Sequence, residues 1–115
     1  MRRHSFILLF IAVFLAPFAH GQRHRAVGSG DTIVVGGLFS LTGEGATLGN
    51  ASEAALELAA RDINAEFASL DLPYRVATMA CDTKLVPAEA LRCTQSLHAA
   101  GADIVIGPQT SAEAG

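Results

Sequence analysis

The residues best suited to chemistry lie in a loop of small and hydroxylated residues, Ser40 to Gly45. The loop follows an apolar, β-branched run that extends to Phe39 and predicts a strand buried on both faces. A helical pattern begins after the loop, at Thr47 or Asn50. A strand that enters a helix through such a loop places backbone N–H groups and hydroxyls at the carboxyl edge of a sheet, where open α/β folds bind ligands. We therefore expect this loop to form one wall of a small-molecule site.

The elements that must position the loop alternate between strand and helix. We predict strands at Thr32–Phe39, Tyr74–Cys81 and Asp103–Gly107, a first helix to about Phe67, and a second from Pro87 to a stop at Gly101. The crossovers are long enough to make the strands parallel. The pattern is an α/β fold of the form β-α-β-α-β. Because a further helix is just beginning at the last residues, we expect residues 32–115 to be the amino-terminal part of a larger lobe, with a complete three-stranded domain as the alternative.

Helical periodicity assigns the inward side of each helix. The first helix is expected to use Asn50 as its N-cap with Glu53 three residues later, unless it begins a turn earlier at Thr47. Its inward side is predicted to carry Ala51, Ala55, Leu58, Ala59, Ile63 and Phe67. In the second helix the spacing of Val86, Ala90, Cys93, Leu97 and Ala100 predicts that Cys93 faces the sheet.

The amino terminus has the features of a secretory signal. A basic start precedes an almost wholly apolar run from Phe6 to Phe18, and small residues follow at Ala19 and Gly21. The run is shorter than the roughly 20 residues that a membrane span needs. We expect residues 1–21 to be a signal peptide, residues 22–31 a flexible linker, and the mature protein to be periplasmic or secreted.

Composition excludes several other classes of function. Removing residues 1–21 leaves six basic and eleven acidic residues, so the formal net charge moves from −3 to −5. An acidic chain is poorly suited to nucleic acid. His98 stands alone in the second helix, so neither a metal site nor a cofactor is predicted. The two cysteines, Cys81 and Cys93, can pair in an oxidising compartment, and the sequence leaves that pairing open.

Three motifs in order carry a resemblance to a known family. They are Leu41-Thr42-Gly43 with Leu48-Gly49 and Asp62-Ile63-Asn64, then Ala80-Cys81-Asp82-Thr83 before Pro87, then Gly101 to Pro108 with Thr110-Ser111. Together they resemble the opening of periplasmic substrate-binding proteins of the branched-chain amino acid (Leu/Ile/Val) class. The resemblance covers nearly all of the chain after residue 31.

The resemblance implies a type I periplasmic binding fold with two lobes and the ligand in the cleft between them. The family's first lobe holds the carboxylate and ammonium of an amino acid, largely through a Ser-bearing loop after the third strand, with added contacts from the first loop. The matching residues are Ser111, Thr110, Gln109, Leu48 and Thr42. The implied function is the delivery of amino acids, by default branched-chain ones, to the membrane permease of an ABC transporter, without enzymatic activity.

Two departures from the family pattern matter. Val86 stands where the family usually has an Asp before Pro87, so the second helix lacks a side-chain cap. Thr110 stands where some members have the cysteine that pairs with the one matching Cys81. Cys93 is then the remaining candidate partner, and whether the two residues lie within the Cα limit of about 7 Å is left open.

Two other functions compete with transport. A receptor's extracellular ligand-sensing domain uses the same fold. A nucleotide-cofactor enzyme is the more remote alternative, because the glycines at 43, 45 and 49 with Asp82 imitate a dinucleotide-binding fingerprint. Their spacing differs from that fingerprint, and Glu44 would repel a pyrophosphate.

Overall fold

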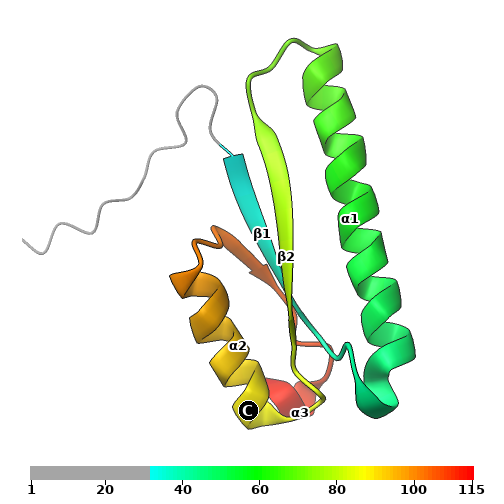
Figure 1. The fold of residues 1–115 in the computed structure, drawn as a ribbon, viewed down its shortest axis with the longest axis vertical. Helices are drawn as coiled ribbons and strands as arrows, with labels where there is room; N and C mark the ends of the chain where they lie inside the picture. The colour runs from blue at the N-terminus through cyan, green and yellow to red at the C-terminus, as the bar shows by residue number, and fades with distance from the viewer. Residues whose placement is uncertain (1–31) are drawn as a thin grey trace, which may run out of the picture.

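The computed structural model describes residues 32–115, which form a parallel three-stranded sheet with helices on both faces (Figure 1). In chain order the elements are β1 (Thr32–Phe39), the 3-10 turn η1 (Gly43–Gly45), α1 (Ala46–Ser69), β2 (Arg75–Asp82), α2 (Pro87–Ala99), β3 (Ile104–Ile106) and α3 (Ser111–Ala114). The strand order is β2-β1-β3, which confirms the predicted α/β class and β-α-β-α-β arrangement. The predicted signal peptide and linker lie outside the described residues.

β1 is the central strand and is buried from Val35 to Phe39. It pairs with β2 from Thr32↔Arg75 to Phe39↔Asp82, and with β3 from Val35↔Ile104 to Gly37↔Ile106. Because all three strands run in the same direction, their carboxyl ends meet at one edge. That edge holds the first and third loops, where the family resemblance implies ligand contacts, together with the loop that follows β2.

The main core lies between the sheet and α2. Leu38 of β1 packs against Cys93 and Leu97 of α2, and all three are buried. Cys93 therefore faces the sheet, as its periodicity predicts. The helix begins after Val86 without a side-chain cap, as the departure from the family pattern predicts, and Pro87 occupies its first turn.

A disulfide joins Cys81 of β2 to Cys93 of α2. Cys81 is the register partner of Leu38, so its side chain points to the same face of the sheet as the core under α2. The two Cα atoms are 5.6 Å apart, inside the distance that a disulfide can span. The bridge thus ties the end of β2 to the helix that follows it.

α1 begins one residue before Thr47, the earlier of the two starts that the sequence allows. Its first residue is Ala46, with Gly45 at the N-cap position, so the predicted Asn50–Glu53 cap is wrong. Asn50 lies inside the helix, where its Nδ2 donates to the carbonyl of Ala46 at 2.7 Å. The 3-10 turn η1 leads directly into α1, so the helix starts from this turn without a side-chain cap.

The inward side of α1 also differs from the prediction. Gly49 and Ala60 are buried, whereas Leu58 is 51% exposed. Asn64 faces the sheet, where its Oδ1 accepts the N–H of Val76 at 2.7 Å and its Nδ2 donates to the Val76 carbonyl at 2.8 Å. The alanines of α1 are distributed around most of the helix, so the periodicity of its apolar residues distinguishes its sides only weakly. The close approach at Gly49 and the polar contact at Asn64 decide which side faces the sheet.

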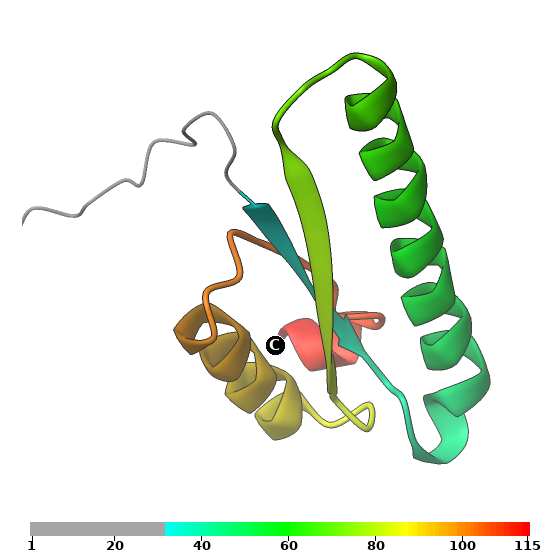
Figure 2. The same ribbon diagram turned by 45° about the horizontal axis from the view of Figure 1, so that its top comes forward.

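The apolar residues of β3 remain exposed, at the edge of the sheet that no other described strand pairs with. α3 follows β3 and lies against α2, on the side of the sheet opposite α1 (Figure 2). Over residues 32–115, none of the helices combines the length and the apolar character that a membrane crossing requires.

Candidate functional site

Three loops meet at the carboxyl edge of the sheet: residues 40–42, 83–86 and 107–110. Both ribbon views place the start of α1, the turn before α2 and the short α3 at this same end (Figures 1 and 2). Hydrogen bonds between side chains and backbone connect these loops to one another. The site is therefore described by the residues that make those connections.

Asp82, the last residue of β2, holds the first loop. Its Oδ1 accepts the backbone N–H groups of Leu41 at 2.8 Å, Lys84 at 3.0 Å and Thr42 at 3.3 Å. Its Oδ2 accepts the Thr42 hydroxyl at 2.5 Å. These donors, the Thr42 hydroxyl foremost, hold the pKa of the Asp82 carboxyl below its ordinary value, against an opposing effect of desolvation.

The lowered pKa of Asp82 predicts an acid-sensitive contribution to stability. The stabilisation is complete above the unfolded-state pKa, about 4, and is lost as the pH falls through the lower folded-state value. The difference in free energy of unfolding between the wild type and Asp82→Asn should therefore shrink below about pH 4. Urea denaturation of both proteins over a pH series measures this difference. A difference that stays constant to the lowest pH at which both proteins fold would contradict the prediction.

Gln109 connects the third loop to the first loop and to α1. Its Oε1 accepts the N–H of Ser40 at 2.8 Å, and its Nε2 donates to the Ser52 hydroxyl at 3.1 Å. The Ser52 hydroxyl in turn donates to the carbonyl of Leu48 at 2.9 Å. Both ends of the Gln109 amide are thus used within the protein, and its contacts bring the third loop beside the first turns of α1.

Glu113 anchors α3 against the second loop. Its carboxylate is buried and accepts the Thr83 hydroxyl, the Thr110 backbone N–H at 3.1 Å and the Thr110 hydroxyl at 2.8 Å. A glutamate at the third helical position that bonds the N-cap backbone is one half of a capping box. Three donors offset the cost of burying this carboxylate.

Comparison with known proteins assigns the family. Residues 32–115 match the profile of the periplasmic binding protein family. The chain belongs to this family. It is also 36% identical over 109 residues to an uncharacterized protein of Methanocaldococcus jannaschii, a match that covers 92% of this chain and 26% of that relative. The chain thus spans about a quarter of the length of the curated relative that it matches.

Members of the periplasmic binding protein family bind small-molecule solutes outside the cytoplasm. Proteins of this family are typically not enzymes, and they usually work with a transporter or a receptor. In the part of the chain that the structure covers, no group of three or more histidine, cysteine, aspartate or glutamate side chains is arranged to hold a metal ion.

The five residues that the family resemblance selects divide into two groups. Thr42 and Gln109 form hydrogen bonds to distant segments, and Thr110 bonds Glu113, which in turn reaches the second loop. Ser111 and Leu48 do not: Ser111 is the exposed first residue of α3, and Leu48 is 62% exposed on the first turn of α1. The Ser111 hydroxyl forms no hydrogen bond within residues 32–115. Their contact with a ligand stays a prediction.

Sequence reasoning noted Asp82 as part of a motif but did not identify it, Ser52 or Glu113 as residues that organise the site. The available signal for Asp82 was its position directly after a strand, beside a neighbouring loop rich in backbone donors and hydroxyls. Ser52 and Glu113 lie in helices, where nothing in the local pattern separates them from solvated polar residues.

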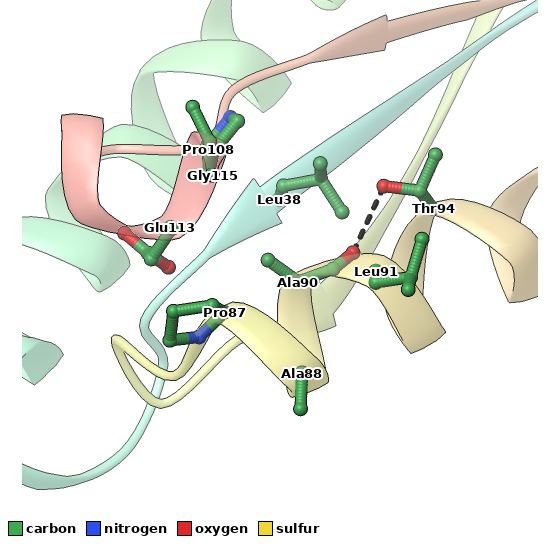
Figure 3. A pocket seen from close by; sticks show the side chains of 10 residues that line it. Leu38, Pro87, Ala88, Ala90, Leu91, Thr94, Pro108, Glu113 and Gly115 are labelled. Atoms are coloured by element: carbon green, nitrogen blue, oxygen red, sulfur yellow. Dashed lines mark hydrogen bonds between the residues drawn. The ribbon is translucent and has the colours of Figure 1, made fainter.

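A cavity of about 500 Å³ adjoins the third loop, between α2 and α3 (Figure 3). Leu38, Ala90, Leu91 and Pro108 are among its lining residues, so its walls are largely apolar. None of the five residues selected by the resemblance lines it. We therefore place the candidate site at the loops, where the polar groups are, and not in this cavity.

Proposed function

We propose that the full-length protein is an extracytoplasmic solute-binding protein that delivers amino acids, branched-chain ones in the first place, to the membrane permease of an ABC transporter. The observation that carries the proposal is the arrangement of the first and third loops. Gln109 joins them through Ser40 and also bonds Ser52 of α1, while Ser111 and Leu48 remain exposed at the same edge. Family membership and the signal predicted at residues 1–21 support export.

The exposed groups suit the two ends of an aliphatic amino acid. The Ser111 hydroxyl is a donor that a carboxylate can accept from, and the Leu48 side chain offers an apolar contact. The carboxylates of Asp82 and Glu113, next to the loops, accept hydrogen bonds from the protein, which partly offset their repulsion of an anionic group. Glu44 in η1 is exposed, so solvent screens its charge. A ligand with one carboxylate and an aliphatic side chain fits this combination best.

Ser111→Ala tests the proposed contact. A hydrogen bond to a charged group contributes about 1.5–3 kcal/mol, so the affinity of the full-length protein for L-leucine should fall on the order of 10- to 150-fold. Thr110 is the N-cap of α3, so loss of the Ser111 hydroxyl should change stability by less than about 0.5 kcal/mol. Isothermal titration calorimetry and thermal unfolding measure the two effects separately.

Glu57→Ala, on the exposed side of α1, is the control and should leave the affinity for L-leucine unchanged. Equal affinity of the wild type and Ser111→Ala, measured well below both melting temperatures, would remove Ser111 from the site. If the wild type bound no aliphatic amino acid, the proposed substrate class would be wrong.

A further inference from the structure

We propose that Asp82 is a positioning residue of the ligand site, and that its carboxylate holds the backbone of the first loop in the shape that receives a ligand. The inference rests on the proposed function and deepens it. It assigns the order of the loop to an acid on the neighbouring strand. Asp82 reaches the loop across a sequence separation of 41 residues, which the pairing of β1 with β2 closes.

The first loop needs such an anchor because of its composition. It leads directly into the turn η1, where Gly43 has a φ of +74° and its Cα faces open space, and the chain then runs through Gly45 into α1. Glycine lowers the cost of such a backbone conformation but increases the number of conformations available to the loop. A ligand that had to order the loop itself would bind more weakly, because ordering opposes association. Contacts from Asp82 to Leu41 and Thr42 order the loop beforehand.

The alternative role for Asp82 is direct contact with a ligand's ammonium group. A carboxylate offers about four lone-pair positions. Asp82 already accepts hydrogen bonds from the Leu41, Thr42 and Lys84 N–H groups and from the Thr42 hydroxyl. Three N–H groups use Oδ1 fully, and Oδ2 accepts the Thr42 hydroxyl and keeps one acceptor position. Most of the acceptor capacity thus serves the protein, which favours positioning over direct contact.

The chain contains a matched control at the opposite edge of the sheet. Asp103, just before β3, accepts the N–H of Val34 in β1 at 2.8 Å. Like Asp82, it is an aspartate whose carboxylate accepts a backbone N–H of another segment, but it lies at the amino end of its strand. Asp103→Ala should therefore reproduce the loss of a carboxylate hydrogen bond without touching the loops.

The experiment compares the full-length wild type, Asp82→Ala and Asp103→Ala. In Asp82→Ala, protection from hydrogen exchange at the amides of Leu41 and Thr42 should fall about 10-fold or more. Calorimetry should show that the affinity of this variant for L-leucine falls about 10-fold. Asp103→Ala should lose protection at Val34 and keep wild-type affinity. Asp82→Asn retains one acceptor oxygen and should recover most of the protection at Leu41. This variant is measured in place of Asp82→Ala if Asp82→Ala does not fold.

Two results would overturn the proposal. Wild-type affinity in Asp82→Ala would show that the anchored loop does not contribute to binding. Lower affinity with unchanged protection at Leu41 and Thr42 would show that Asp82 contacts the ligand directly. If the wild type itself did not bind L-leucine, the proposed substrate would fail, while hydrogen exchange would still decide whether Asp82 orders the loop.

Discussion

Gly49→Ala is expected to destabilise the protein by about 3 kcal/mol, at the upper end of the cost of overpacking. A Cβ at this position would lie 1.8 Å from the carbonyl oxygen of Ser40 and 2.4 Å from its carbonyl carbon. Backbone atoms cannot turn aside as a flexible side chain can. The N–H of Ser40 is moreover held by Gln109, so the clash should disturb the contact between the first and third loops.

The sign of the Gly49→Ala effect is diagnostic. Helix propensity alone predicts stabilisation by about 1 kcal/mol, because alanine favours a helix over glycine. Chemical denaturation of Gly49→Ala beside Thr47→Ala, an exposed position in the same helix, separates packing from propensity. Thr47→Ala should change the free energy of unfolding by less than about 0.5 kcal/mol. A stability of Gly49→Ala equal to or above that of the wild type would show that α1 does not approach Ser40 closely.

Opening the Cys81–Cys93 disulfide is expected to lower the free energy of unfolding by about 3 kcal/mol. The reason is that the closed loop reduces the conformational entropy of the unfolded chain. The two cysteines are 12 residues apart in sequence. Cys93 is also fully buried beside Leu38 and Leu97, so the bridge reinforces the core under α2. Thermal unfolding with and without dithiothreitol measures the effect, with mass spectrometry to establish that the bridge has opened.

A variant with both Cys81→Ala and Cys93→Ala is the control for reduction. It should melt below the oxidised wild type, and dithiothreitol should not shift its transition. If the melting temperature of the wild type stayed the same after complete reduction, the bridge would contribute nothing to the free energy of unfolding.

Local patterns in the sequence determine most of the fold. The apolar, β-branched run from Ile33 to Val35 predicts the central strand with the bounds that the structure has. The four-and-three spacing of Ala90, Cys93 and Leu97 predicts the buried side of α2. These features depend on the period of apolar residues within one segment, and that period is readable without knowing the neighbours. The motifs that carry the family resemblance likewise lie in order along the chain.

Only the tertiary structure decides which loop residues join the loops. Gln109 is 69 residues from Ser40, and Asp82 is 41 residues from Leu41, so no local pattern reports either hydrogen bond. The orientation of α1 also depends on a distant contact, between Gly49 and the backbone at Ser40. Parallel pairing brings the carboxyl ends of β1, β2 and β3 to one edge, where side chains meet the backbone donors of other segments. The sequence by itself determines which residues reach that edge; the packing of the strands and helices decides what each of them binds there.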